Sequence, residues 1–136
     1  MSNDKLNLQS VRIALDSKVI LDDVNLKIDT GEIVSLMGSS ASGKTSLIRS
    51  IAGFHNISSG VIQIDGQIVD DSIRRSDVAM RNVGVIFQDL ALFPHLTVRE
   101  NICFGLNNID NTQQHNRAKK LELSLIHISE PTRRRG

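Results

Sequence analysis

The chain has almost no cysteine and few aromatic side chains. Its 136 residues contain no tryptophan, no tyrosine and a single cysteine, Cys103. A lone cysteine excludes an internal disulfide bond, and with no histidine cluster beside it Cys103 predicts no metal site. We expect Cys103 to be a small core residue, because free cysteine is among the most buried residue types.

Long hydrophobic runs are also missing. No stretch of about 18 apolar residues could span a bilayer, and the opening MSNDKLNLQS lacks the apolar segment of a secretory signal. A hydrophobic fraction of 40% is nevertheless ordinary for a globular domain. The sequence therefore predicts one cytoplasmic domain.

Neither sign of charge dominates. The 16 Lys and Arg residues nearly balance the 15 Asp and Glu residues, leaving a formal net charge of +1. The one basic run, Arg133 to Arg135, lies at the end of the chain. We therefore expect no nucleic-acid partner.

Three segments predict strands. Residues 19–28 end in alternation, with Val24, Leu26 and Ile28 on one side, which is typical of a half-buried strand. Residues 32–38, EIVSLMG, are mostly apolar and predict a strand buried on both faces, as in a parallel sheet. Residues 83–87 predict another buried strand.

Helix and turn signals surround these strands. After the glycine-containing residues 38–45, apolar residues recur at helical spacing, namely Leu47, Ile48, Ile51 and Ala52. Gly53 is placed to end that helix in a left-handed conformation. Asp65 and Gly66 separate two short apolar runs, which predicts a tight hairpin. TVRE at residues 97–100 is a capping box that opens a helix through Ile102 and Leu106, and residues 107–116 predict a polar loop.

The glycine-rich segment carries the chemistry. Residues 38–45 read GSSASGKT, the pattern of a phosphate-binding loop, and they stand between a predicted strand and a predicted helix. Gly38 and Gly43 allow backbone angles closed to other residues, so that successive N–H groups can surround an anion. The unpaired N–H groups at the start of the next helix add to this attraction.

Each position of this loop has an expected role. The cradle is predicted to comprise the continuous stretch of Gly38, Ser39, Ser40, Ala41, Ser42, Gly43, Lys44, Thr45 and Ser46. Lys44 is expected to bridge the terminal phosphates as a point charge, and the Thr45 hydroxyl to bind Mg²⁺. The short side chains before Gly43 and Ser46 after it let the backbone approach the ligand closely.

Residues 5–122 resemble ATP-binding-cassette (ABC) ATPases. The likeness rests on ILDDVNLKIDTGEIVSLMGSSASGKTSLIRSIAGF, on SSGVIQIDGQIV and on VGVIFQDLALFPHLTVRENICFGL. LFPHLTVREN is most similar to the ATPase subunits of ferric iron, polyamine, sulfate and maltose importers. The resemblance implies an α/β phosphate-loop NTPase core with an antiparallel β-subdomain, truncated at the start of the helical subdomain.

The same resemblance implies ligands and partners. ATP and Mg²⁺ are the expected ligands, and Gln88 is expected to contact Mg²⁺ and to position the attacking water. Residues 90–96 would receive a membrane permease subunit, although packing of this loop on the next helix explains their apolar character equally well. The intact protein would pair with a second ATPase subunit, as a homodimer or otherwise, on the cytoplasmic face of the inner membrane.

One position departs from the family. Leu15 stands where these ATPases usually carry an aromatic residue that stacks on adenine. We therefore expect weaker adenine stacking, with the phosphate site retained.

The end of the chain does not continue the resemblance. Residues 123–136 contain no LSGGQ-like signature, and LSLIHISEPTR instead resembles a translated transposase adapter from DNA library preparation. We expect residues 1–122 to be a partial nucleotide-binding domain and residues 123–136 to be a non-native tail. Such a fragment would bind nucleotide weakly and would not hydrolyse it.

Two other functions compete with that of an importer subunit. A soluble, non-transport ABC-type ATPase shares the nucleotide-binding fold, because a fold alone does not fix the partner. A phosphate-loop kinase is disfavoured by the segment around Gln88 after an antiparallel hairpin.

The tail gives a first prediction. Independent sequencing of the genomic locus should show a different continuation after about Glu122, leading to LSGGQ or a close variant. Adapter-free chromosomal DNA that encodes LSLIHISEPTRRRG would contradict this.

Overall fold

The computed structural model describes residues 3–88, 92–106, 112–113, 116–117 and 119–120. The chain divides into two compact units, residues 1–85 and residues 86–136. The first unit carries a four-stranded sheet and the helix α1 (Lys44–Ala52), and the second carries α2 (Val98–Cys103).

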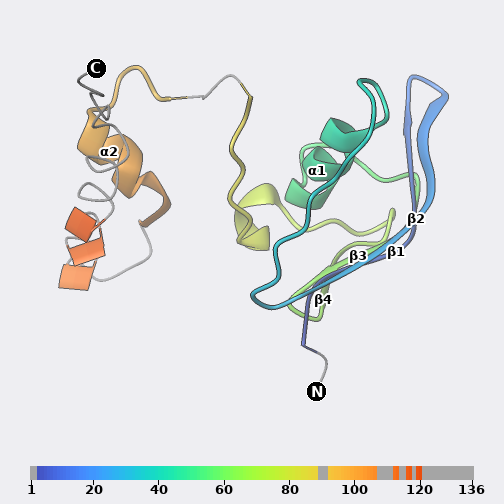
Figure 1. The fold of residues 1–136 in the computed structure, drawn as a ribbon, viewed down its shortest axis with the longest axis horizontal. Coiled ribbons are helices and arrows are strands. Elements are labelled where there is room, and N and C mark those ends of the chain that lie inside the picture. Colours follow the sequence, from blue (N-terminus) through green and yellow to red (C-terminus); the bar gives the residue numbers. More distant parts are fainter. Residues whose placement is uncertain (1–2, 89–91, 107–111, 114–115, 118, 121–136) are drawn as a thin grey trace, which may run out of the picture. The chain divides into compact units, whose positions relative to one another are not determined.

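The sheet of the first unit is antiparallel throughout. Its strands are β1 (Asp4–Leu15), β2 (Lys18–Asp29), β3 (Ser59–Ile64) and β4 (Gln67–Asp70), in the spatial order β2-β1-β3-β4 (Figure 1). The predicted hairpin at Asp65 and Gly66 is confirmed, because both residues have positive φ and join β3 to β4. This is the conformation that a tight hairpin turn requires.

β1 lacks the regular alternation of apolar and polar residues that would predict a strand. Leu8, Val11 and Ile13 are all fully buried, yet they do not follow a strict alternation. The register shifts after Leu8 against β2, and Ser10 has a positive φ of 46°. Such a bulge adds one residue to the strand, so that the apolar face resumes one position late.

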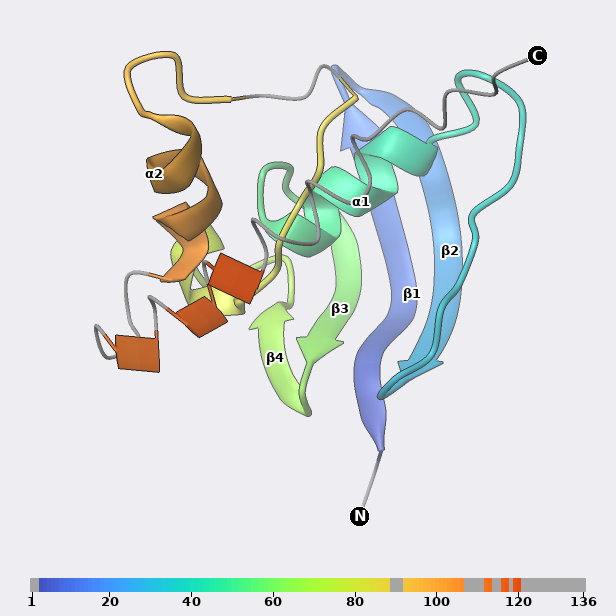
Figure 2. The same cartoon turned by 60° about the vertical axis from the view of Figure 1, so that its left-hand side comes forward.

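The core lies between this sheet and α1, which covers one face of the sheet (Figure 2). Leu47 of α1 packs in one cluster with residues from three strands and the loop before β3, namely Leu8, Val11, Ile13, Ile57, Ile62, Ile64 and Val69. The predicted alternation in β2 is confirmed, since Val24 and Leu26 are half-buried against this cluster. Gly53 ends α1 with a φ of 97°, as its position predicts.

Two predicted strands are not formed. Residues 32–38 and 83–87 have no strand conformation, and the structure pairs neither with any strand of the described sheet. Ile33 is 95% exposed, Met37 92% and Ile86 90%. The prediction of doubly buried parallel strands is therefore wrong for this chain, because such a strand needs paired neighbours on its edges and cover on both faces.

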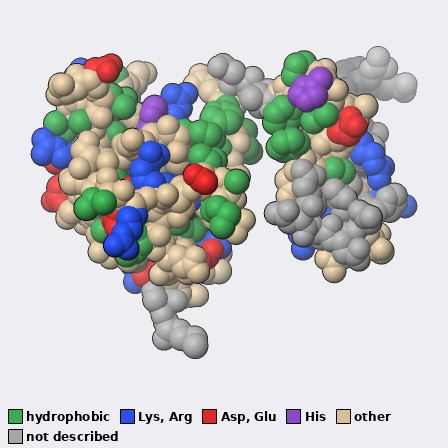
Figure 3. Space-filling model, turned by 180° about the vertical axis from the view of Figure 1, so that it is seen from behind, with side chains coloured by type: hydrophobic (Ala, Val, Ile, Leu, Met, Phe, Trp, Pro, Cys, Tyr) green, Lys and Arg blue, Asp and Glu red, His purple; other side chains and the backbone are tan. Residues whose placement is uncertain are grey.

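Hydrophobic side chains consequently reach the surface of the first unit (Figure 3). Among the described residues, no helix is both long enough and apolar enough to cross a membrane.

The second unit confirms the predicted helix start. Thr97 accepts a hydrogen bond from the backbone of Glu100, and Glu100 accepts one from the backbone of Thr97, which completes a capping box. The α-helix ends at Cys103 and continues as a 3₁₀ helix, η2 (Phe104–Leu106). Cys103 is half-buried, so its prediction as a core residue is wrong.

The predicted polar loop at residues 107–116 is partly outside the described residues. Residues 112–113 and 116 are helical, in contrast to the prediction. Polarity alone is a poor loop signal here, because Gln113 has high helix propensity.

The exposed segment yields a prediction about stability. Ile33→Ala should change the free energy of unfolding by less than about 0.5 kcal/mol, because the side chain is in solvent. Ile13→Ala removes the same atoms from the core and should cost about 2–5 kcal/mol. Urea unfolding of both variants measures this difference, and an equal loss in both would mean that residues 32–38 are buried in solution.

Candidate functional site

The motif at residues 38–45 follows the exposed segment of residues 32–38 and leads into the N-terminus of α1. Ala41 and Gly43 have positive φ angles of 66° and 92°, with Ser42 between them. The Ser42 N–H donates to the Ser39 carbonyl over 3.2 Å and closes a turn. Positive φ angles at alternate residues turn neighbouring N–H groups to one side, as an anion site requires.

The two glycines of the motif act for different reasons. Gly43 has the predicted positive φ, and an added Cβ would lie 2.8 Å from Leu21 Cγ. No positive φ is found at Gly38, where an added Cβ would instead lie 2.7 Å from Ser42 Oγ. The expectation of an unusual backbone angle at Gly38 is therefore wrong. Glycine at position 38 instead avoids displacing the Ser42 side chain, and Ala41 supplies the second left-handed position.

The N-terminus of α1 has no capping side chain. Gly43 is the N-cap residue, and the first turn contains no acidic side chain. The N–H groups of this turn thus lack a side-chain acceptor, and the helix dipole favours negative charge at this end. Ser40 lies in the loop before this turn, and Ser46 lies within it.

Lys44 places its charge over the loop. The ammonium donates to the Gly38 carbonyl over 2.6 Å, to the Ser39 carbonyl over 2.7 Å and to Ser42 Oγ over 3.1 Å. All three donors of a lysine are used. An anion that binds at this loop could replace these neutral acceptors as the hydrogen-bond partner of the ammonium.

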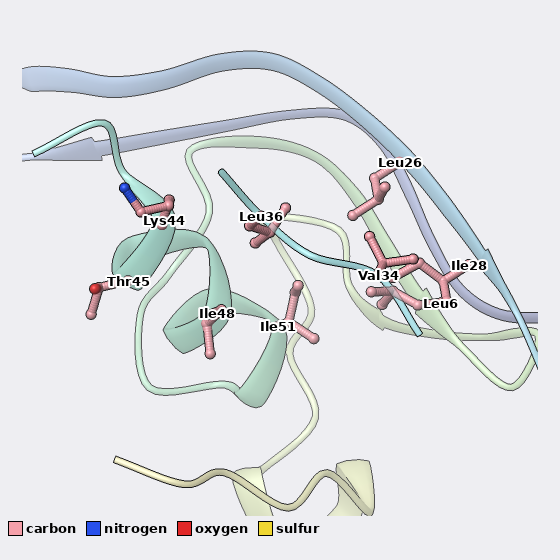
Figure 4. Close-up of a pocket in the computed structure, with 9 residues that line it drawn as sticks. All are labelled: Leu6, Leu26, Ile28, Val34, Leu36, Lys44, Thr45, Ile48 and Ile51. Carbon is pink, nitrogen blue, oxygen red and sulfur yellow. The ribbon is translucent and has the colours of Figure 1, made fainter. Parts of the chain in front are cut away.

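A cavity of about 450 Å³ lies beside this loop, within the first unit. Figure 4 shows Lys44 and Thr45 on its α1 side and Leu6, Leu26 and Ile28 on its sheet side. The remaining lining residues are also apolar, namely Val34, Leu36, Ile48 and Ile51. The polar edge of this cavity therefore consists of two residues of the phosphate-loop motif, and the rest offers no ligand for a phosphate group.

Two further predicted positions lie apart from the motif in sequence. Gln88 is exposed and belongs to the second unit. Leu15 is half-buried at the end of β1, next to the turn of Asp16 and Ser17. The roles expected for Gln88 and Leu15 remain predictions.

The apolar loop of the second unit has a fixed shape. Asn101 accepts from the Phe93 N–H over 2.9 Å, and its amide donates to the carbonyls of Phe93, Leu96 and Thr97 over 3.0 to 3.2 Å. Phe93 also packs on Phe104, with ring centroids 4.4 Å apart. Sequence reasoning missed Asn101, although an Asn four residues after a capping Thr is placed to bond backward along the chain.

This loop combines packing with exposure. Leu92 is 74% exposed, and residues 90 and 91 lie outside the described residues. The ring of His95 meets Phe93 edge-on at 5.9 Å.

At the start of α2, hydrogen bonds from the Thr97 backbone and hydroxyl hold the pKa of Glu100 below its usual range. The capping box is therefore intact at neutral pH.

Comparison with known proteins places these features in a family. Residues 21–135 match the family described as ABC transporter. The chain is 43% identical over 101 residues to the sulfate/thiosulfate import ATP-binding protein CysA 2 of Shewanella oneidensis, covering 74% of the chain and 27% of that protein. It is 35% identical over 124 residues to the Fe(3+) ions import ATP-binding protein FbpC of Pasteurella multocida, covering 91% of the chain and 34% of that protein.

A third relative is the spermidine/putrescine import ATP-binding protein PotA of Fusobacterium nucleatum. The identity is 44% over 106 residues, which cover 78% of the chain and 27% of PotA. The chain thus spans only 27% to 34% of the length of these relatives. With a phosphate-loop motif at the start of α1 and a match over most of its length, this chain belongs to the ABC transporter family of ATPases.

Proposed function

We propose that this chain binds the phosphates of ATP at residues 38–46 and is part of the ATP-binding subunit of an ABC importer. The observation that carries the proposal is the position of the Lys44 ammonium, 2.6 Å and 2.7 Å from two carbonyls of a loop that leads into an uncapped helix. A positive charge, a turn with alternating φ signs and a free helix N-terminus are three independent attractions for one anion.

The residues of the loop fit a nucleotide phosphate. A phosphate oxygen would replace the loop carbonyls as the acceptor for Lys44, and it would bond the N–H groups of the turn between Ser39 and Gly43. An added Cβ at Gly38 would lie 2.7 Å from Ser42 Oγ, so glycine at this position avoids displacing a hydroxyl that accepts from Lys44. The side chains of Ser39, Ser40 and Ser42 are short enough to leave the backbone accessible.

The chain also offers oxygen ligands for Mg²⁺. Thr45 is exposed at the start of α1, and its hydroxyl is the kind of hard oxygen donor that Mg²⁺ prefers. Gln88 is the second proposed ligand and would also orient the attacking water, since its amide carries both an acceptor and donors. Mg²⁺ would neutralise charge on the terminal phosphates.

The importer assignment rests on the relatives. Their names describe import ATP-binding proteins for sulfate, ferric iron and polyamines. We propose that the loop of residues 92–96 contacts a membrane permease subunit, because Asn101 fixes its backbone while Leu92 stays exposed. The working complex would contain two paired ATPase subunits at the cytoplasmic face of the inner membrane.

Lys44 provides the direct test of nucleotide binding. Lys44→Ala should weaken MgATP binding by at least about tenfold, because a hydrogen bond from a charged group to the phosphates is lost. Lys5→Ala is the matched control, since it removes the same charge from an exposed ion pair with Asp65. Calorimetric titration measures both affinities, and equal binding by wild type and Lys44→Ala would contradict the proposal.

Hydrolysis should not accompany binding. The Gln88 amide is not a base near neutral pH, and residues 1–136 contain no segment resembling the family's signature loop. We expect phosphate release by the wild-type chain to equal that of Lys44→Ala. Release above this control that increases with protein concentration would show that the chain is catalytically complete.

A further inference from the structure

Arg81 is the largest fully buried side chain among the described residues, and it lies outside the phosphate-loop motif. It is 2% exposed at the end of the 3₁₀ helix η1 (Val78–Arg81). The rest of η1 is exposed, including Met80 and Val78. Burial of a charged residue is costly unless every donor finds a partner, so this position calls for a specific explanation.

The guanidinium uses all of its donors. Nε donates to the Ser76 carbonyl over 3.1 Å, and one terminal nitrogen donates to the carbonyls of Ser50 and Ile51 over 2.9 Å and 3.1 Å. The other terminal nitrogen donates to the Val69 carbonyl over 3.3 Å and to Asp70 Oδ2 over 3.4 Å. These five hydrogen bonds match the five N–H donors of arginine.

Two of these acceptors are carbonyls in the last turn of α1, where backbone carbonyl groups lack the usual partner four residues further along the helix. The Ser50 carbonyl also accepts from the Gly53 N–H over 3.2 Å, whereas Arg81 is the partner described for the Ile51 carbonyl. A cation at this end also interacts favourably with the helix dipole. Glycine at position 53 leaves room for the Arg81 guanidinium, because an added Cβ would lie 2.9 Å from Arg81 Nε.

Asp70 connects this cation to the sheet. Its side chain is fully buried at the end of β4, and it pairs with Arg81 on one side and with Arg75 Nε over 3.3 Å on the other. Its other oxygen accepts from the Ser72 N–H over 3.0 Å. Arg75 also donates to the Gly53 carbonyl over 3.3 Å. Arg81 and Asp70 thus tie the C-terminus of α1 to β4 by charged, buried hydrogen bonds.

We propose that Arg81, held by Asp70, is a positioning residue for the phosphate loop, acting through α1. The inference rests on the proposed nucleotide binding at residues 38–46. The first-turn N–H groups of α1 form part of the phosphate cradle, so any tilt of the helix moves the cradle. A helix of nine residues is about 13 Å long, and a tilt of about 5° at its far end displaces the first turn by about 1 Å.

The alternative is that Arg81 only stabilises the fold. It predicts that removal of Arg81 lowers the protection of α1 and of the sheet by the same factor and leaves ATP affinity per folded molecule unchanged. The positioning role predicts a selective loosening of α1 and weaker ATP binding. The two roles are therefore separated by measurements made on the folded population.

The test variant is Arg81→Met combined with Asp70→Asn in the 136-residue chain. Removing both charges avoids leaving a lone buried carboxylate, which is strongly destabilising. Arg75→Met is the matched control, because it removes a guanidinium from the outer side of the same carboxylate, with its one bond to the Gly53 carbonyl, and leaves the bonds of Arg81 to α1 in place. Arg81→Lys keeps the buried charge with fewer donors and replaces the double variant if that variant does not fold.

The first measurement is amide hydrogen exchange without nucleotide. In the double variant, exchange at residues 44–50 should accelerate by about tenfold or more relative to β3, because local opening of α1 becomes easier. Arg75→Met should show the wild-type ratio, and Arg81→Lys an intermediate one. An equal change in α1 and β3 would overturn the positioning role.

The second measurement is calorimetric titration with MgATP, corrected for the folded fraction. The double variant should bind about tenfold to hundredfold more weakly, as expected when the displaced first turn loses one hydrogen bond to a charged phosphate. Wild-type affinity in a variant with loosened α1 would overturn the proposal. Absence of ATP binding by the wild-type chain would instead refute the proposed function, and the exchange measurement would still decide whether Arg81 tethers α1.

Discussion

The first unit depends on one strand, β1, which pairs with both β2 and β3. β1 contributes Leu8, Val11 and Ile13 to the core, and Leu47 of α1 packs in the same cluster. The bulge at Ser10 is necessary to this arrangement, because without the extra residue Val11 and Ile13 would face away from Leu8. Gly60 leaves room for this bulge, since an added Cβ at Gly60 would collide with the carbonyl groups of Gln9 and Ser10. The position of the phosphate loop therefore follows from the register of β1.

α1 links this core to the proposed chemistry, and its two ends are held in opposite ways. Its N-terminus has no capping side chain and lies under the Lys44 ammonium. Its C-terminus is saturated by the Arg81 guanidinium and by the N–H of Gly53. One end is thus available to an anion because no side chain occupies it, and the other is fixed because its carbonyl groups are bonded. Buried Arg–Asp pairs are weak evidence for stability, which makes a positioning role a better account of Arg81 than a simple contribution to folding.

The second unit shows how a loop can be ordered and still present apolar surface. The capping box of Thr97 and Glu100 fixes the start of α2, and Asn101 returns from the first turns of that helix to bond Phe93. These are local interactions between residues less than ten positions apart, so the loop keeps its shape without deep burial. Leu92 remains exposed as a consequence.

The sequence alone determined the local features: the hairpin turn at Asp65 and Gly66, the end of α1 at Gly53, the capping box at Thr97 and the phosphate-loop motif with its family. Each is fixed by backbone angles or hydrogen bonds within a few residues, so a short pattern suffices. Tertiary structure decided the rest. Residues 32–38 and 83–87 have strand-like composition, but a strand forms only where another chain segment pairs with it. Likewise, the close approach of position 38 to Ser42 arises only in the folded loop. The role of Arg81 depends on acceptors up to 31 positions away in the chain, which no local pattern records.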